Sequence, residues 1–168
     1  MIAIACVDNN NGIGKDGKLL ISIPEDMKFF REVTDDSIVV MGRKTLFSFK
    51  DKAPLKNRIN VVFTNNKKLE KEYKDYDNIF FIKTLTELNE IFKKHPEKKV
   101  FLIGGATLYN DLIDFCDKCY ITKVNKTFKA DSFFPDLAAH GFILDSESEV
   151  FTHNKIEYQF ITYKKSKE

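Results

Sequence analysis

The sequence predicts a single α/β domain with a central, mostly parallel β-sheet, flanking helices and a C-terminal antiparallel hairpin. First, 168 residues with 43% hydrophobic side chains suit one domain with a sizeable core. Second, short apolar runs alternate with helical stretches over the first two thirds of the chain. Third, the last third holds strand candidates with no long helix between them. We assign residues 1–164 to this domain and expect residues 165–168 to form a frayed tail.

Several short runs in the first two thirds are rich in β-branched and aromatic residues, which is typical of strands. They are almost continuously apolar, so we expect a sheet that is covered on both faces. The runs are "IAIACV" (2–7), "SIVVMG" (37–42), "INVVFT" (59–64), "NIFFI" (78–82) and "KVFLIGG" (99–105).

The first helix begins at Pro24, because the missing N–H of proline costs nothing at the first helical position. Asp26 lies in the first turn, and Phe29, Phe30 and Val33 follow three, four and seven residues later, so they share its face. The helix dipole alone explains an acidic residue here. A second explanation is a carboxylate in an apolar pocket, which must be hydrogen-bonded and is often functional. The helix by itself leaves both explanations open.

Two further helices are predicted. The first spans residues 84–94, where Thr84 and Glu87 form a capping box and Pro96 marks the end. The second spans residues 106–115 and has apolar residues at helical spacing, namely Leu108, Tyr109, Leu112 and Phe115.

The C-terminal third contains the strand candidates of the hairpin. Alternation of apolar and polar residues in the middle candidate is typical of a half-exposed antiparallel strand. The candidates are "CYITKV" (119–124), "FILDSESEVF" (142–151) and "EYQFITYKK" (157–165).

The charge pattern argues against nucleic-acid binding, because the net charge is only +2 and lysines are scattered among acidic residues. No apolar run approaches the roughly 20 residues of a membrane-spanning helix, and the N-terminal residues do not resemble a signal peptide. We therefore expect a cytoplasmic protein that contacts no membrane. We expect a monomer, because nothing in the sequence indicates an interface.

Cys116 and Cys119 form a CxxC pair, and the chain has three cysteines in all. The pair precedes a strand-like run, whereas a thioredoxin-like pair opens a helix. No second pair of ligands has the spacing of a zinc site. We interpret both cysteines as small buried residues beside a strand and expect no metal.

Two strand-to-helix turns have the composition of phosphate sites. In "VVMGRKT", Gly42 precedes two cations at the start of a helix, where free N–H groups attract anions. In "VFLIGGATLY", Gly104 and Gly105 allow a ligand to approach the backbone closely. Each turn is a weak motif that a tight connection explains equally well. Two such turns in one small domain favour a dinucleotide.

A long polar segment, "VDNNNGIGKDGKLL" (7–20), separates the first strand from the helix of Asp26. Loops of this length in a compact domain are usually functional or disordered. Because it lies beside both phosphate turns, we interpret it as a lid.

Several motifs occur in a fixed order: "GIGKDGKL", "IPEDMKFF", "VVMGRKT", "INVVFT", "FLIGGATLY", "ITKV" and "ADSFFPD". In this order the chain resembles the dihydrofolate reductase family along essentially its whole length. The resemblance implies NADPH-dependent reduction of 7,8-dihydrofolate to 5,6,7,8-tetrahydrofolate, with hydride added to C6 and a proton to N5. It also implies a role in one-carbon and thymidylate metabolism, and inhibition by antifolates.

The resemblance implies substrate positions as well. Asp26 matches the acid that hydrogen-bonds to the 2-amino group and N3 of the pterin, where it would orient and polarise the ring while water delivers the proton to N5. Arg58 matches the arginine that pairs with the α-carboxylate of the glutamate tail. The remaining positions are Ile4, Ala5, Met27, Phe30, Phe49, Leu55, Ile103 and Thr122.

The implied cofactor positions gather at the two turns and the adjoining strands. They include the phosphate site, the residues whose backbone holds the nicotinamide carboxamide, and the adenosine side. They are Cys6, Ile13, Gly14, Leu19, Gly42, Arg43, Lys44, Thr45, Phe63, Thr64, Asn65, Ile103, Gly104, Gly105, Ala106, Thr107, Leu108 and Tyr109.

The chain departs from the family pattern in two places. Leu20 and Ile21 stand where the family usually has Pro and a Trp that orders a water in the pterin pocket, and this chain has no Trp. Asn65 stands where a serine or a cation is frequent, so binding of a 2′-phosphate would depend mainly on Arg43.

Two alternative functions stay open. One is a reductase of riboflavin-precursor synthesis with the same fold, which lacks the acid at this helix start. The other is a non-catalytic pterin- or nucleotide-binding protein.

Overall fold

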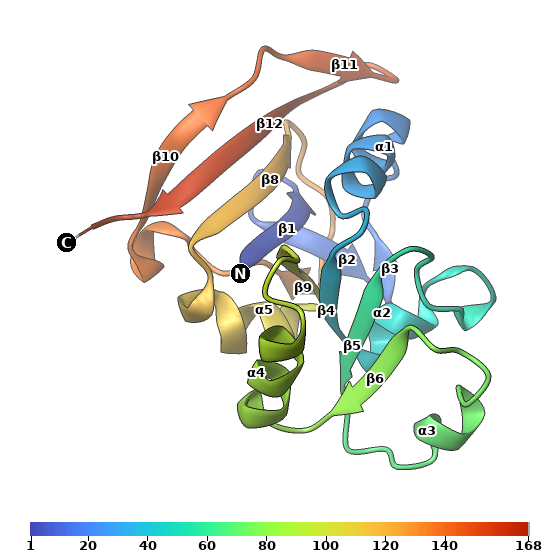
Figure 1. Cartoon of the computed structure of the whole chain (residues 1–168). Helices are drawn as coiled ribbons and strands as arrows, with labels where there is room; N and C mark the ends of the chain where they lie inside the picture. The colour runs from blue at the N-terminus through green and yellow to red at the C-terminus, as the bar shows by residue number, and fades with distance from the viewer. Residues whose placement is uncertain (168) are drawn as a thin grey trace.

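The computed structural model describes residues 1–167, which form a nine-stranded sheet with helices on both faces (Figure 1). The strand order is β10-β12-β8-β1-β7-β4-β5-β6, with β11 paired to β12. The strands of this sheet are β1 (Ile2–Val7), β4 (Ile38–Gly42), β5 (Ile59–Phe63), β6 (Ile79–Ile82), β7 (Val100–Gly104), β8 (Lys118–Val124), β10 (Phe142–Glu147), β11 (Phe151–His153) and β12 (Ile156–Lys165).

The sheet is parallel from β8 through β1, β7, β4 and β5 to β6. Strand β12 pairs antiparallel with β8, and β10 and β11 pair antiparallel with β12. This arrangement confirms the predicted fold class. Strand β12 includes Lys165, one residue beyond the expected end of the domain.

The strand predicted over residues 142–151 is in fact two strands, and the prediction of one continuous strand is wrong. The pairing of β10 with β12 shifts register between Leu144 and Ser146. Just beyond β10, the Ser148 hydroxyl accepts a hydrogen bond from the Phe160 amide at 2.9 Å, and the Ser148 carbonyl accepts one from the Gln159 side chain at 2.9 Å. These contacts occupy groups that a regular ladder would use, so the strand ends and β11 starts afresh.

The segment over residues 7–20 was expected to be an irregular loop, and the structure corrects this. It forms a hairpin of β2 (Gly12–Lys15) and β3 (Lys18–Leu19), and β2 also pairs with β9 (Ser132–Phe133). The turn residues Asp16 and Gly17 both have positive φ, 51° and 76°. Asp-Gly at the centre of a two-residue turn is a strong hairpin signal, because such turns need positive φ at both positions.

The helices are α1 (Pro24–Val33), α2 (Arg43–Phe47), α3 (Leu69–Glu72), α4 (Leu85–Lys94) and α5 (Ala106–Leu112), with 3₁₀ turns at Lys50–Lys52, Ile113–Phe115 and Ala138–His140. The predicted capping box of α4 is present, because Thr84 accepts from the Glu87 amide and Glu87 accepts from the Thr84 amide. Helix α5 ends three residues before its predicted limit, since its last turn tightens into a 3₁₀ turn, as often happens at helix ends. Helix α3 was not expected from the sequence.

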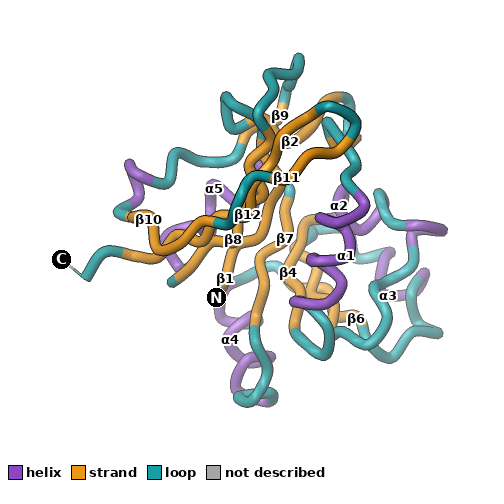
Figure 2. The backbone as a smooth tube through the Cα atoms, turned by 90° about the horizontal axis from the view of Figure 1, so that it is seen from above, coloured by secondary structure: helices purple, strands orange, loops and turns teal. Residues whose placement is uncertain are grey.

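The helices lie in two layers, with α1, α2 and α3 on one side of the strands and α4 and α5 on the other (Figure 2). Alternate residues of β4 serve the two layers, since Val39 and Met41 pack with the first and Val40 with the second. A sheet covered on both faces needs apolar residues at every position, which explains the continuous apolar runs.

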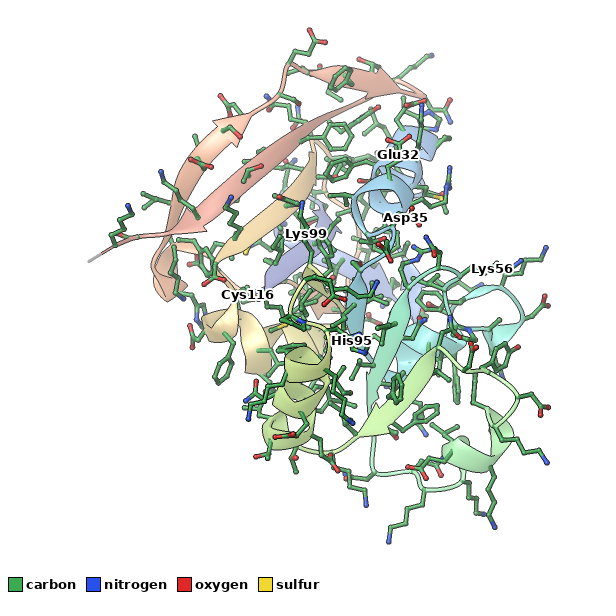
Figure 3. All side chains as sticks on the ribbon, in the orientation of Figure 1. Glu32, Asp35, Lys56, His95, Lys99 and Cys116 are labelled. Carbon is green, nitrogen blue, oxygen red and sulfur yellow. The ribbon has the colours of Figure 1, made fainter. Side chains whose placement is uncertain are left out.

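Cys116 and Cys119 are buried in the second layer, with 2% and 0% of their surface exposed. Figure 3 shows Cys116 at the end of the helical segment that follows α5. Burial raises the pKa of Cys116 to about 11 and the pKa of Cys119 to about 12, so both thiols stay protonated. This supports their interpretation as packing residues.

Among residues 1–167, no helix combines the length and apolar character needed to cross a membrane. Within the same range, no three His, Cys, Asp or Glu side chains lie together in a way that suits a metal ion.

Candidate functional site

Most of the predicted cofactor residues lie at the carboxyl ends of the central strands, whereas Arg58 lies just before the amino end of β5. Strand β1 lies between β7 and β8, and β7 lies beside β4. The carboxyl ends of parallel strands meet at one edge of a sheet, where ligands of open α/β folds bind. Residues Cys6, Gly42 and Gly104 therefore come from segments far apart in sequence to one edge.

Asp26 projects from the first turn of α1 toward this edge. Its Oδ1 atom accepts a hydrogen bond from the Thr122 hydroxyl, and Thr122 pairs with Cys6 across β8 and β1. Desolvation raises the pKa of Asp26, while hydrogen bonds from the Thr122 hydroxyl and the Cys6 thiol act to lower it. Both explanations for this acid therefore apply: it lies at a helix N-terminus and it is also a partly desolvated carboxylate held by hydrogen bonds.

The neutral thiol of Cys6 contributes to this arrangement. Burial raises the pKa of Cys6, and the neighbouring charge of Asp26 raises it further. A thiol that stays protonated is a weak donor to a carboxylate. The carboxylate thus faces two donors from the sheet and keeps other acceptor positions for a ligand, because an ionised carboxylate has about four lone-pair sites.

An apolar wall adjoins Asp26. Most of the apolar residues among the predicted substrate positions pack in one hydrophobic cluster that includes Ile4, whereas Ala5 packs against the other cluster. Met27 is an exception, because it is 47% exposed and receives a hydrogen bond from Ser22 at its sulfur. The members of the wall are Ile4, Phe30, Phe49, Leu55 and Ile103.

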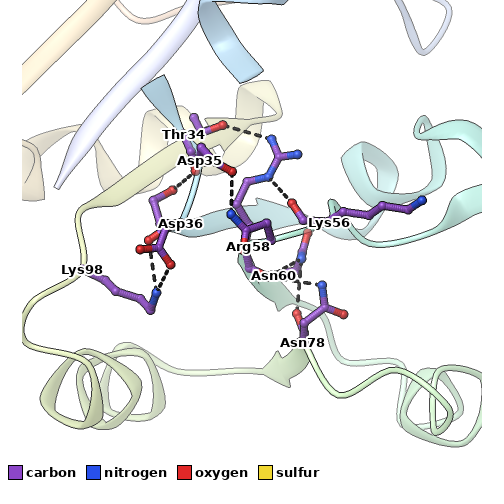
Figure 4. A network of polar contacts seen from close by, with 10 residues as sticks. Thr34, Asp35, Asp36, Lys56, Arg58, Asn60, Asn78 and Lys98 are labelled. Carbon is purple, nitrogen blue, oxygen red and sulfur yellow. Dashed lines mark hydrogen bonds and ion pairs between the residues drawn. The ribbon is translucent and has the colours of Figure 1, made fainter. Parts of the chain in front are cut away.

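Arg58 is held by two hydrogen bonds from its guanidinium group (Figure 4). Its Nε donates to the Lys56 carbonyl at 2.9 Å, and its Nη1 donates to the Thr34 hydroxyl at 3.1 Å. Thr34 in turn donates to the Phe30 carbonyl at 2.7 Å, which ties Arg58 to the end of α1. Burial lowers the pKa of Arg58, and Asp35 opposes that shift. Among the described residues, none accepts a hydrogen bond from Nη2. The N–H groups of Nη2 are therefore available for a carboxylate.

The two predicted phosphate turns are neighbours. A Cβ atom added to Gly105 would lie 3.7 Å from Thr45 Oγ1, so the start of α5 approaches the start of α2. Neither helix has a side-chain cap, which leaves the first N–H groups of both helices without a side-chain partner. The exposed cations Arg43 and Lys44 stand at the start of α2.

Gly104 is required by its surroundings. Its φ is +120°, and an added Cβ would lie 3.2 Å from Cε2 of Tyr109. Tyr109 is buried beneath this turn and donates from its hydroxyl to the Ile4 carbonyl at 2.5 Å. Burial raises the pKa of Tyr109, so the hydroxyl keeps the proton that makes this bond. The tyrosine joins the Gly104-Gly105 turn to β1, which pairs with the strand of Thr122.

The hairpin of β2 and β3 is anchored beside the site by two acids that the sequence analysis did not assign. The Asp131 amide donates to the Gly14 carbonyl at 3.0 Å, and its carboxylate accepts from the Asp16 amide at 3.0 Å. Asp8 accepts from the amides of Asn10, Gly12 and Phe128 at 2.9, 2.7 and 2.9 Å. An Asp followed by turn residues is a local signal for the bonds of Asp8 to the Asn10 and Gly12 amides.

The remaining predicted cofactor positions lie at or near the first or last residues of helices and strands. Phe63 is the last residue of β5, and the hydroxyl of Thr64 accepts from the Asn66 amide at 3.1 Å. Asn65 is exposed, and Leu19 in β3 is 73% exposed. Ala106, Thr107 and Leu108 form the first turn of α5.

Ile21 occupies an apolar position next to Cys6. It packs in a small cluster with Cys6 and Phe128 around Val124. Together with Leu20 it lines a narrow space of about 10 Å³ beside Ile13. A larger groove of about 430 Å³ lies elsewhere, between α3, β6 and α4, and no predicted site residue lines it. Geometry and chemistry, and not cavity size, therefore identify the site.

Several known proteins are similar in sequence to this chain. A family model described as Dihydrofolate reductase matches residues 1–165. A dihydrofolate reductase of Bacillus subtilis (strain 168) is 33% identical over 164 residues, covering 96% of this chain and 92% of that protein. A dihydrofolate reductase of Heliothis virescens is 30% identical over 179 residues, covering 98% and 96%. A bifunctional dihydrofolate reductase-thymidylate synthase of Plasmodium chabaudi is 36% identical over 135 residues, which are 79% of this chain but 23% of that protein. The chain thus spans about a quarter of this bifunctional relative and nearly all of the other two.

Proposed function

The chain belongs to the dihydrofolate reductase family, and on that premise we propose that it reduces 7,8-dihydrofolate to 5,6,7,8-tetrahydrofolate with NADPH. One observation carries the proposal: the Asp26 carboxylate is held by the Thr122 hydroxyl at the edge of an apolar wall. A pterin presents adjacent N–H donors on one edge and an aromatic face on the other sides. Such a ring fits a carboxylate beside aromatic side chains.

Asp26 binds and polarises the pterin in this proposal. Its carboxylate accepts hydrogen bonds from the 2-amino group and N3 and thereby fixes the ring against Phe30 and Ile103. The raised pKa of Asp26, caused mainly by desolvation, makes the carboxylate a stronger acceptor for such donors. Because the family geometry places this acid away from N5, water supplies the proton to that atom. A diaminopyrimidine antifolate presents an equivalent pair of donors, its 2-amino group and its ring nitrogen N1, once N1 is protonated.

The residues at the two turns suit a nicotinamide dinucleotide. The close approach at Gly104 and the uncapped helix starts give backbone donors for a pyrophosphate. Arg43 and Lys44 give charge for a 2′-phosphate, which is why we propose NADPH over NADH. When bound, the cofactor supplies the hydride for C6 of the substrate. The hairpin of β2 and β3 excludes water from the site.

Arg58 recognises the substrate tail. Its Nε and Nη1 atoms are occupied by Lys56 and Thr34, so the guanidinium plane is oriented before a ligand binds. The remaining N–H groups pair with the α-carboxylate of the glutamate. Phe49 and Leu55, in the same hydrophobic cluster, flank the benzoyl group between the pterin and this carboxylate.

A spectrophotometric assay of NADPH oxidation tests the function. We expect oxidation that depends on 7,8-dihydrofolate, and slower oxidation when NADH replaces NADPH. Parallel reactions with the ribosylated pyrimidine of riboflavin-precursor synthesis test the first alternative. Oxidation of NADPH with that pyrimidine but not with dihydrofolate would assign the chain to the riboflavin-type enzymes. Binding of a pterin without oxidation of NADPH would make it a non-catalytic binding protein.

A further inference from the structure

We propose that Asn60 and Asn78 are positioning residues that orient the tail-binding segment 55–58. We call the two side chains the amide clamp. This inference rests on the proposed function, because it assigns to the clamp the task of holding Leu55 and Arg58 for the tail of a folate. Neither asparagine stands near the predicted reacting atoms, and neither is among the predicted site residues.

Asn60 makes the most extensive contacts of the clamp. The residue lies in β5 and is 0% exposed. Its Oδ1 accepts from the Leu55 amide at 3.0 Å, and its Nδ2 lies 3.0 Å from the Leu55 carbonyl and 3.2 Å from the Arg58 carbonyl. A side-chain amide offers both a donor group and an acceptor, so one Asn60 can bond to both groups of Leu55.

Asn78, the residue just before β6, makes two of the same contacts. Its Nδ2 donates to the Leu55 carbonyl at 3.1 Å and to the Arg58 carbonyl at 3.2 Å. The carbonyls of Leu55 and Arg58 therefore each accept hydrogen bonds from both side-chain amides. A carbonyl oxygen has two lone pairs and can accept both. The backbone N–H of Asn60 also donates to the backbone carbonyl of Asn78 at 2.9 Å. The two clamp residues are therefore joined directly as well (Figure 4).

The segment needs such support because it has no regular structure. Residues 53–58 belong to neither a helix nor a strand, and Asn57 has a positive φ of 58°. The clamp replaces the missing ladder bonds and transfers the rigidity of β5 and β6 to the segment. A site built on strands is more precise than one on a free loop.

The clamp controls the guanidinium through the backbone. Arg58 Nε donates to the carbonyl of Lys56, which lies between the two clamped residues. Its Nη1 donates to Thr34 on the opposite side, so the orientation of the fork depends on the distance between this segment and α1. If the segment moves, the carboxylate of the tail loses its paired donors. The pterin, which contacts Asp26, keeps its own.

The test compares a ligand with a glutamate tail and one without it. Folate and pteroate share the pterin and benzoyl groups, and only folate carries the glutamate. Dissociation constants for both are measured by fluorescence with NADPH present, for wild type, Asn78→Ala and Asn78→Ser. We expect folate binding to weaken about tenfold in both variants and pteroate binding to change by less than about twofold. Asn89→Ala, at an exposed position on α4, serves as the matched control and should change neither constant.

A double-mutant cycle separates positioning from general stability. In an Arg58→Ala background, Asn78→Ala should have no further effect on folate binding, because the group that it positions is gone. Equal weakening for folate and pteroate, or independent effects of the two substitutions, would overturn the positioning role. Thermal unfolding shows that each variant is folded, and Asn78→Ser is the milder change if Asn78→Ala unfolds.

The proposed reaction and the clamp fail in different ways. If the wild-type protein binds folate but does not oxidise NADPH in the presence of dihydrofolate, the proposed reaction is overturned. The clamp is then still tested by the dissociation constants of folate and pteroate. A wild-type protein that binds folate no more tightly than pteroate overturns the clamp, even if dihydrofolate is reduced.

Discussion

At the scale of single residues, Asp26 links binding to stability. Desolvation raises its pKa in the folded protein, and the hydrogen bonds from Thr122 and Cys6 only partly offset this. A raised folded-state pKa means that the contribution of this group to stability is present below the unfolded-state pKa and is lost as the pH rises through the folded-state pKa. At neutral pH the ionised carboxylate therefore lowers stability. A ligand that donates hydrogen bonds to it would restore that stability.

Replacing Asp26 with Asn should separate these two effects. We expect the rate of dihydrofolate reduction at neutral pH to fall by about 10²–10⁴-fold, the usual weight of acid–base participation, because the ring is no longer polarised for protonation by water. The unfolding midpoint at neutral pH should rise, because a neutral amide removes the desolvated charge while it still accepts from Thr122. Steady-state kinetics and thermal unfolding of the same samples measure both. Near-full activity in a folded Asp26→Asn protein would contradict the role of the carboxylate.

In the proposed function, the preference for NADPH over NADH depends on Arg43. Replacing it with Ala should weaken NADPH binding by about 1–3 kcal/mol, the scale of a lost charge-assisted hydrogen bond. NADH binding should barely change, because that cofactor has no 2′-phosphate. Fluorescence titrations with both cofactors measure this, and Lys129→Ala, an exposed cation in the segment after β8, is the control. Equal losses for the two cofactors would mean that Arg43 does not contact the 2′-phosphate.

At the scale of elements, the hairpin of β2 and β3 depends on contacts with the segment around β9. Strand β2 has only four residues and β3 has two, so their mutual pairing alone is marginal. The carboxylate of Asp131 accepts from the Asp16 amide at the turn, and its backbone pairs with Gly14. The Asp16 amide and the Ser132 hydroxyl, with nearby Lys15, lower the pKa of Asp131, so this acceptor stays ionised over the neutral range.

Asp131→Ala should therefore loosen the hairpin without unfolding the domain. We expect faster hydrogen exchange at the Asp16 amide, a slower hydride-transfer step, and an unfolding midpoint close to that of wild type. Hydrogen exchange followed by mass spectrometry and single-turnover kinetics with deuterated cofactor measure these effects. If exchange at Asp16 stays slow in the variant, the carboxylate is not the anchor of this turn.

At the scale of the whole molecule, a few polar contacts join segments that lie far apart in sequence. The Tyr109 hydroxyl bonds to the Ile4 carbonyl, 105 residues away, and the N-terminal amine pairs with Asp117 at 3.2 Å. Asp8 joins the beginning of the β2 segment to Phe128, 120 residues away. Burial acts to raise the pKa of Asp8, but the amides of Phe128, Asn10 and Gly12 outweigh it and lower the pKa.

The lowered pKa of Asp8 predicts part of the acid sensitivity of the fold. A lowered folded-state pKa gives a contribution to stability that is complete above the unfolded-state value of about 3.9 and is lost as the pH falls through the folded-state pKa. Asp8→Asn should lower the free energy of unfolding at neutral pH by about 1–3 kcal/mol, because an amide cannot accept with both atoms and leaves one buried N–H without its partner. The difference between variant and wild type should shrink toward pH 2. Denaturant unfolding across this range measures it, and a constant difference would exclude the titration of Asp8 as its origin.

The sequence by itself determined the features whose signals are local. Apolar runs predicted the strands, Thr84 and Glu87 predicted the start of α4, and Pro24 placed Asp26 in the first turn of α1. The Asp16-Gly17 turn also has a local signal in the sequence, although a loop was expected there. Order of motifs was enough to indicate the family, because each motif combines several neighbouring residues.

Only the tertiary structure decided which distant groups meet. Thr34 holds Arg58 from 24 residues away, Thr122 reaches Asp26 across 96 residues, and Asp131 reaches Asp16 across 115. A single polar residue carries no local pattern that identifies such a partner. The amide clamp belongs to the same class, since Asn60 and Asn78 meet only because β5 and β6 are neighbours in the sheet. Local patterns fix backbone conformation over a few residues, whereas these contacts depend on strand order and register, which exist only in the assembled fold.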